Sequence, residues 1–259
     1  MDFGLKNKTA LVLGASRGLG AACALELAKE GAQVFAAARN TDAISDWAEA
    51  EGVSANVTPI PLDLSDAEMV AEVAERMASE GIDILVNNSG GPAAGPAQGQ
   101  SRAAWQAAYE AMALPIFALT DAVLPGMKDR GFGRIVTIGS SGINTPIPNL
   151  ALSNGVRSAI AGWSKTLAAE VAADGVTVNL VLPGRIGTDR VRELDEGKAQ
   201  KTGSSVEHVA AASRATIPTG RYGDPSEFAA VVAFLASTRA SYVTGSMIRV
   251  DGGMIKSLI

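Results

Sequence analysis

Short apolar runs alternate with longer stretches of helical periodicity along the whole chain. Many of the runs are rich in valine and isoleucine and apolar on both faces, which is typical of strands buried inside a parallel sheet. The stretches between them are long enough to be crossover helices, so the pattern predicts one α/β domain with a doubly wound parallel sheet and helices on both faces. The predicted strands cover residues 9–13, 32–37, 57–62, 82–86, 134–138, 176–182 and 247–250.

Two helix starts carry their own signals. Residues 65–68 read Ser-Asp-Ala-Glu, which is a capping-box pattern. Residues 224–227 read Asp-Pro-Ser-Glu and place Pro225 in a first helical turn. Both signals are structural, and we expect no chemistry from either.

Residues 184–223 form a long stretch without strand character that follows the sixth predicted strand. In open α/β sheets ligands bind beyond the carboxyl ends of the strands, which is where this stretch begins. We therefore predict a lid over a substrate. A contact between subunits is the alternative.

A glycine triplet is the most informative local motif. Gly14, Gly18 and Gly20 follow the first apolar run directly and open a helical stretch that continues to Lys29. A buried strand, a tight turn and a helix start together present free backbone N–H groups to an anion, and residues without Cβ let a pyrophosphate approach closely. The motif predicts dinucleotide binding, although any strand-turn-helix corner favours glycine.

Composition narrows the function classes. The 259 residues carry a net charge of −5 with a pI near 5.0, which argues against a nucleic-acid or membrane surface. The start of the chain lacks a basic and apolar leader, so we expect a cytoplasmic protein. Cys23 is expected in the core, and His208 is the single histidine, so we expect no metal site.

Further motifs follow the later strands: Asp63-Leu64, residues 87–90 (Asn-Asn-Ser-Gly), Pro183-Gly184 and residues 250–253 (Val-Asp-Gly-Gly). With the glycine triplet, this order resembles the short-chain dehydrogenase/reductase family over residues 8–253. The resemblance implies a single-domain Rossmann fold over residues 1–259, with a seven-stranded parallel sheet. It also implies NAD(P) held over the strand ends, and usually a homotetramer.

The resemblance also implies which residues bind the cofactor. The glycine loop would line the pyrophosphate, residues 63–64 the adenine, residues 88–90 the ribose region, and residues 183–188 the nicotinamide side. Several of these have structural alternatives: Asn88 could close a turn, and Thr188 could cap a lid helix. The expected cofactor-binding residues are Gly14, Ser16, Arg17, Gly18, Leu19, Gly20, Arg39, Asp63, Leu64, Asn88, Gly90, Pro183, Gly184, Ile186 and Thr188.

The end of the second strand bears on the choice of cofactor. An acidic residue there would bind a bare ribose 2′-hydroxyl and repel a 2′-phosphate. The chain instead has Arg39, and Arg17 of the glycine loop is also available. A guanidinium suits a phosphate, so we predict NADP(H). A solvated strand-end charge is the alternative for Arg39.

The resemblance fails at the expected acid. By position, the family's tyrosine falls on Ser153 and its lysine on Arg157, giving Ser-x-x-x-Arg in place of Tyr-x-x-x-Lys. The family's serine is retained as Ser140, whereas its helix asparagine falls on Met112. An aliphatic hydroxyl is a far weaker acid than a phenol. Ser140, Ser153 and Arg157 are nevertheless the catalytic candidates, and Tyr222, after the lid, is a remote substitute donor.

Two function classes stay open at this point. One is an NADPH-dependent oxidoreductase that reduces a carbonyl, with 3-oxoacyl thioesters as a substrate class supplied by the resemblance. The other is a non-catalytic dinucleotide-binding sensor, or a structural subunit of a hetero-oligomer. We expect a homo-oligomer, a tetramer or a dimer, paired through the alanine-rich helices at 103–113 and 159–173. Ordinary burial on the sheet would also explain those helices.

Overall fold

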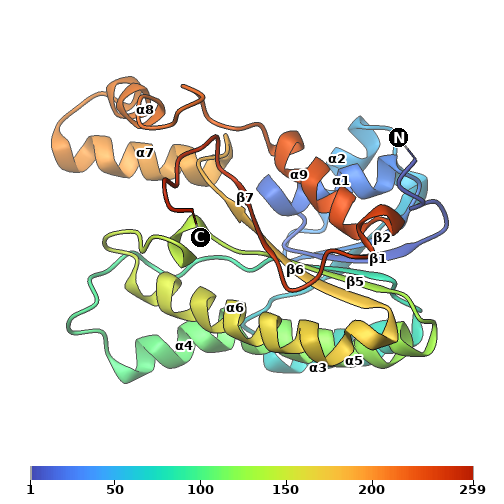
Figure 1. Cartoon of the computed structure of the whole chain (residues 1–259). Coiled ribbons are helices and arrows are strands. Elements are labelled where there is room, and N and C mark those ends of the chain that lie inside the picture. The colour runs from blue at the N-terminus through green and yellow to red at the C-terminus, as the bar shows by residue number, and fades with distance from the viewer. Residues whose placement is uncertain (1, 259) are drawn as a thin grey trace.

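A seven-stranded, fully parallel sheet forms the centre of the molecule in the computed structural model, which describes residues 2–258 (Figure 1). The strand order is β3-β2-β1-β4-β5-β6-β7, so the chain winds outward from β1 in both directions. This confirms the predicted doubly wound α/β fold. The strands are β1 (Thr9–Leu13), β2 (Gln33–Ala38), β3 (Val57–Pro61), β4 (Ile84–Asn87), β5 (Gly133–Ile138), β6 (Val176–Pro183) and β7 (Met247–Val250).

Helices cover both faces of the sheet. Figure 1 shows α1, α2 and α9 on one face and α3, α4, α5 and α6 on the other, with α7 and α8 projecting beyond one end of the strands. The helices are α1 (Gly18–Lys29), α2 (Asp42–Ala50), α3 (Ala67–Ser79), α4 (Arg102–Met112), α5 (Leu114–Asp129), α6 (Ala151–Val171), α7 (Asp189–Thr202), α8 (Val206–Arg214) and α9 (Pro225–Ala236).

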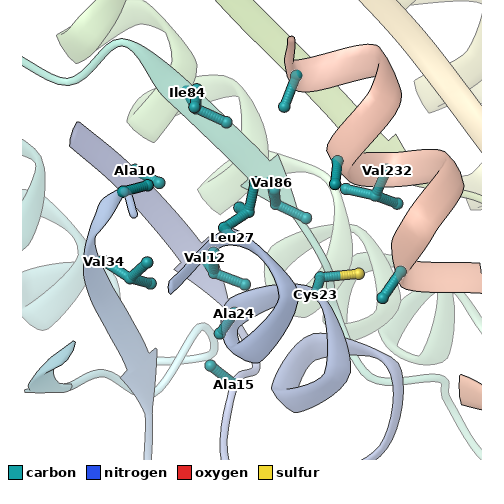
Figure 2. Packing of buried hydrophobic residues seen from close by; sticks show 14 of the residues in the cluster. Ala10, Val12, Ala15, Cys23, Ala24, Leu27, Val34, Ile84, Val86 and Val232 are labelled. Carbon is teal, nitrogen blue, oxygen red and sulfur yellow. The ribbon is translucent and has the colours of Figure 1, made fainter. Parts of the chain in front are cut away.

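The core is divided by the sheet into two apolar layers. In one layer Val12 and Val86 of the central strands pack against α1 and α9, with Cys23 and Val232 between them (Figure 2). Cys23 is fully buried, as expected, and burial raises the pKa of its thiol. In the other layer, alternate residues of the same strands, such as Leu11, pack against α3, α5 and α6. Burial on both faces explains why the central strands are mostly apolar.

The strand predictions differ from the structure only at their ends, but one helix cap is corrected. The cap of α3 is Asp66, whose side chain accepts from the backbone N–H groups of Glu68 and Met69. Ser65 instead donates its hydroxyl hydrogen to Asp63 at 2.7 Å. At α9 the predicted start is confirmed, because Asp224 forms a full capping box and Pro225 opens the helix.

The stretch Arg102–Asp129 is long and apolar enough to cross a membrane by length and composition alone. It consists of α4 and α5, which meet at Ala113 in front of Pro115, where the missing amide interrupts the helical ladder. α4 packs against α6, and α5 packs against α3. The apolar residues of this stretch are thus explained by the helical layer in which they lie.

Candidate active site

The carboxyl ends of β1, β4, β5 and β6 lie next to one another in the sheet, so the loops that follow them share one edge. This edge carries the glycine loop, the segment after Asn87, Ser140 and the turn at Pro183. In a doubly wound sheet this is where a ligand is expected. The sequence motifs are therefore brought together as predicted.

The glycine loop is too tight for side chains. A Cβ on Gly20 would collide with the carbonyl oxygen of Gly14, and a Cβ on Gly14 would lie 2.6 Å from Nδ2 of Asn88. Gly14 and Gly18 also have positive φ values, 63° and 61°, which L-residues rarely adopt. α1 begins at once, and its N-cap residue Arg17 provides no side-chain cap for the first N–H groups. These features fit a pyrophosphate held by backbone amides.

The Asn88 side chain holds the start of this loop. Its Nδ2 donates to the carbonyl oxygens of Leu13, at 3.2 Å, and Gly14, at 3.4 Å. The side chain thus ties the end of β4 to the end of β1 instead of closing its own turn. Gly90, two residues later, is exposed on the same edge.

The turn after β6 is equally close-packed. The amide of Gly184 donates to the carbonyl of Val250, and a Cβ on Gly184 would lie 2.6 Å from Cα of Asp251. Pro183 is the last residue of β6, and Ile186 is buried beneath the start of the lid segment. The Val-Asp-Gly-Gly motif at residues 250–253 therefore packs against this turn and holds it in place.

Ser140 begins the short helix η2 (Ser141–Ile143) directly after β5. Its Oγ accepts the backbone N–H of Gly142 at 3.0 Å, which leaves the hydroxyl hydrogen free to donate. The side chain is only partly buried. Ser140 is thus an oriented hydrogen-bond donor at the strand end.

Ser153 lies in the first turn of α6, and its side chain is also partly buried. Among residues 2–258, its hydroxyl has no hydrogen-bond partner. The neighbouring Asn154 is held by the backbone of Ile147, to which its Nδ2 donates at 2.9 Å. A Cβ on Gly142 would lie 2.5 Å from Oδ1 of Asn154, so α6 and η2 are packed closely together.

Arg157 follows Ser153 by one turn of α6. Its guanidinium donates to three backbone carbonyls: Ile138 at 3.2 Å, Ser89 at 3.1 Å and Gly90 at 3.3 Å. Burial lowers the pKa of Arg157 to about 10, so it is still a cation at neutral pH. Sequence reasoning missed these partners, because backbone carbonyls leave no trace in residue types.

The position at which the family carries a helix asparagine is apolar. Met112 is only 2% exposed and packs with Ala108, Ile116, Leu152 and Val156 between α4 and α6. The side chain at this position therefore offers no polar group for a proton relay.

Arg39 and Asp63 follow the carboxyl ends of β2 and β3. Arg39 is exposed at the end of β2, and its charge contributes to the lowered pKa of Asp63. The larger cause of that shift is the pair of hydrogen bonds that Asp63 accepts from Ser65. Leu64 is half-buried beside the second core layer.

The predicted lid segment, residues 184–223, contains α7 and α8 and closes on itself where Ile186 bridges Gly223. Thr188 takes the N-cap position of α7 without a side-chain capping bond, and it faces Gly18, whose Cβ would lie 3.8 Å away. The start of α7 therefore borders the glycine loop.

Arg17 connects this loop to α7. Its Nη1 lies 3.2 Å from Oε1 of Glu193 and 3.9 Å from Oδ2 of Asp189. The hydrogen bond from Arg17 is the largest cause of the lowered pKa of Glu193. Because these side chains are exposed, the pair adds little to stability.

Tyr222 is bonded within residues 184–223. Its hydroxyl donates to Oδ2 of Asp195 at 2.6 Å, and burial raises its pKa. Asp195, which is 3% exposed, also accepts from Arg185 at 3.1 Å. Asp195 and Tyr222 line a cavity of about 310 Å³ that Thr188 also lines.

Comparison with known proteins identifies this arrangement. A family model described as enoyl-(acyl carrier protein) reductase matches residues 14–255, which is most of the chain. The chain belongs to the short-chain dehydrogenase/reductase family. This confirms the resemblance seen in the sequence, and it places the protein among the NAD(P)-dependent oxidoreductases.

Curated relatives of this short-chain dehydrogenase/reductase match it over nearly its whole length. It is 38% identical over 254 residues to 3-oxoacyl-[acyl-carrier-protein] reductase FabG of Vibrio cholerae, covering 96% of this chain and 98% of that protein. It is 37% identical to FabG of Escherichia coli K12, over 98% of this chain and 99% of that one.

Solved structures agree with the fold of this short-chain dehydrogenase/reductase. L-sorbose reductase from Gluconobacter frateurii, complexed with NADPH and L-sorbose, superposes with a TM-score of 0.92 at 32% identity over all of both chains. YwfH, an NADPH-dependent reductase involved in bacilysin biosynthesis, has a TM-score of 0.91 at 30% identity, covering 98% of this chain and 100% of that one. Within residues 2–258 of the present chain, no group of three or more His, Cys, Asp or Glu side chains is placed to hold a metal ion.

Proposed function

We propose that this protein is an NADPH-dependent reductase whose carbonyl substrate is held by the hydroxyl groups of Ser140 and Ser153. The observation that carries the proposal is the pairing of a side-chain-free phosphate cradle with a free hydroxyl donor on the same sheet edge. When bound, the reduced nicotinamide supplies a hydride. The residues of the chain position the reactants and stabilise the developing negative charge.

The glycine loop and the ends of β2, β3, β4 and β6 would hold the cofactor. In this assignment the loop takes the pyrophosphate, the pair Asp63 and Leu64 the adenine, and the turn after β6 the nicotinamide side. The assigned residues are Gly14, Ser16, Arg17, Gly18, Leu19, Gly20, Arg39, Asp63, Leu64, Asn88, Gly90, Pro183, Gly184, Ile186 and Thr188.

The proposed preference for NADP(H) rests on Arg39. It is an exposed cation at the end of β2, where an acid would favour NAD(H). Arg17 is close by but is engaged with Glu193, so its participation requires that ion pair to exchange for a phosphate. Relatives with NADPH or NADP in their solved structures support this choice.

The Ser-x-x-x-Arg sequence defines an atypical site in this proposal. Ser140 keeps a free hydrogen because its oxygen already accepts from Gly142, and Ser153 has an unpartnered hydroxyl among the described residues. Two such donors stabilise an oxyanion but do not readily surrender a proton. Water therefore delivers the proton to the product oxygen.

3-Oxoacyl thioesters are the proposed substrate class. The support is the 38% and 37% identity to two FabG proteins over nearly the whole chain. If the acyl group is carried on a protein, that carrier is a protein partner. Residues 184–223 act as the substrate lid in a single domain over residues 1–259, of which residues 1 and 259 lie outside the described part. A cytoplasmic homo-oligomer, a tetramer or a dimer, completes the proposal.

A non-catalytic dinucleotide sensor or structural subunit is the second candidate. The buried, apolar Met112 favours it, because the relay position offers no polar group. The cofactor cradle is compatible with both functions, so binding alone does not separate them.

The test is NADPH oxidation against 3-oxoacyl thioesters, small ketones and quinones. We expect turnover of at least one substrate, a fall in Ser140→Ala, and recovery in Ser140→Thr, which keeps the hydroxyl. Ser158→Ala, on the exposed side of α6, is the control that leaves the rate unchanged. Flat traces for the whole panel, with NADPH binding intact, would favour the sensor.

A further inference from the structure

Arg157 joins three separate segments. The side chain leaves α6, and its two terminal nitrogens donate to Ile138 at the end of β5 and to Ser89 and Gly90 after β4. All three acceptors are backbone carbonyls. Among residues 2–258, no Asp or Glu forms an ion pair with this guanidinium. Its hydrogen bonds therefore hold the main chain in place and neutralise no carboxylate.

The arrangement requires a guanidinium. Arginine offers five N–H groups in a rigid fork, so one side chain reaches acceptors on different strands at once. An ammonium is a compact point charge on a flexible stem and does not reproduce that spread. The side chain is partly buried, and this desolvation lowers its pKa to about 10.

The fixed segments carry the proposed chemistry. Ser140 lies two residues after Ile138, and Ser153 lies one turn before Arg157 on α6. Asn88 anchors the start of this loop to β1, but Ser89 is 5% exposed and its hydroxyl oxygen has no hydrogen-bond partner within the described residues. At Ser89 and Gly90 the loop is held through its backbone carbonyls, by Arg157.

We propose that Arg157 is a positioning residue: it fixes the ends of β4 and β5 against α6 and so sets the separation of Ser140 and Ser153. The inference rests on the proposed function for its consequence in turnover, but its structural part stands alone. A positioning role differs from the catalytic role for which the sequence makes Arg157 a candidate.

The chain provides a matched control at the opposite end of β5. Arg134 is 3% exposed and also donates to three backbone carbonyls: Gly133 at 2.8 Å, Gly175 at 3.2 Å and Ser237 at 3.0 Å. Burial lowers its pKa too. Arg134→Lys therefore removes the same kind of contact far from the site residues.

The experiment compares amide hydrogen exchange in wild type, Arg157→Lys and Arg134→Lys. We expect both variants to melt at lower temperature. We expect only Arg157→Lys to exchange faster, by about five- to tenfold, in residues 88–95 and 139–145, because a hydrogen-bonded closure is weakened there. If Arg157→Lys is poorly folded, Arg157→Gln, which retains one pair of amide donors, is measured well below its melting temperature.

The kinetic readout separates positioning from general stability. For a substrate that turns over, Arg157→Lys is expected to lower kcat about tenfold or more with little change in KM for NADPH, whereas Arg134→Lys leaves both unchanged. Unaltered exchange at 88–95 in both Arg157 variants would overturn the inference, and so would the same exchange pattern in Arg134→Lys. If no substrate is turned over but exchange rises as expected, the proposed function fails and the positioning role stands.

Discussion

Substitution of Gly14 by alanine tests the phosphate cradle in a quantitative way. The residue has φ 63°, so an L-residue there costs about 1–2 kcal/mol. Its new Cβ would lie 2.6 Å from Nδ2 of Asn88 and displace that side chain from the carbonyls of Leu13 and Gly14. Two lost hydrogen bonds add roughly 1 kcal/mol each.

The free energy of unfolding is therefore expected to fall by about 3–4 kcal/mol, which is roughly 6–16 °C in Tm for a chain of this size. Gly52→Ala is the matched control, because its φ is 70° but nothing lies within 4 Å of its Cβ. That variant shows only the backbone cost of about 1–2 kcal/mol.

Denaturant titration and calorimetry with NADPH measure the two effects. Gly14→Ala is expected to weaken NADPH binding by at least about tenfold, equivalent to 1.4 kcal/mol, whereas Gly52→Ala binds as wild type. Equal unfolding free energies for the two variants, together with unchanged NADPH affinity, would refute the role given to this loop.

Three further predictions follow from local contacts. Tyr222→Phe removes the hydrogen bond to buried Asp195 and is expected to cost about 2 kcal/mol in urea unfolding; a loss below about 0.5 kcal/mol would contradict the contact. Hydrogen bonds from Arg221 first, and then from the backbone N–H of Asp224, lower the pKa of Glu227 from 4.5 to about 2, so the stability that they add is present above pH 4.5 and disappears as pH falls toward 2. Arg221→Gln is expected to raise the pKa of Glu227, measured by carboxyl NMR, and to weaken the loss of unfolding free energy below pH 4.5. An unchanged pKa of Glu227 would contradict the ion pair between Arg221 and Glu227. Gly162→Ala is expected to raise Tm slightly, because alanine favours a helix and nothing lies within 4 Å of the added Cβ in α6. A lower Tm would show that neighbouring atoms clash with the added methyl group.

The fold was predictable because the central strands are buried on both faces, which makes runs such as Ala10–Leu13 of β1 apolar without interruption. The glycine loop was equally readable, since only a missing Cβ fits between Gly14 and Gly20. The N-cap of α3 was harder to predict, because Ser65 and Asp66 are neighbours and both residue types can cap a helix. The backbone conformation places Asp66 at the N-cap.

The tertiary contacts of the site were not predictable. Arg157 binds backbone carbonyls, which every residue supplies, so no residue pattern marks its partners. The contact between Tyr222 and Asp195 joins positions that lie 27 residues apart within the lid segment. In both cases the sequence indicated a candidate for chemistry, and the structure assigns the side chain to holding the main chain or the lid.

Calorimetric titration of the purified protein with NADPH and with NADH tests the central claim most directly. We expect NADPH to bind, and to bind more tightly than NADH. We expect Arg39→Ala to reduce the difference between the two affinities. Failure of both nucleotides to bind, or tighter binding of NADH, would contradict it.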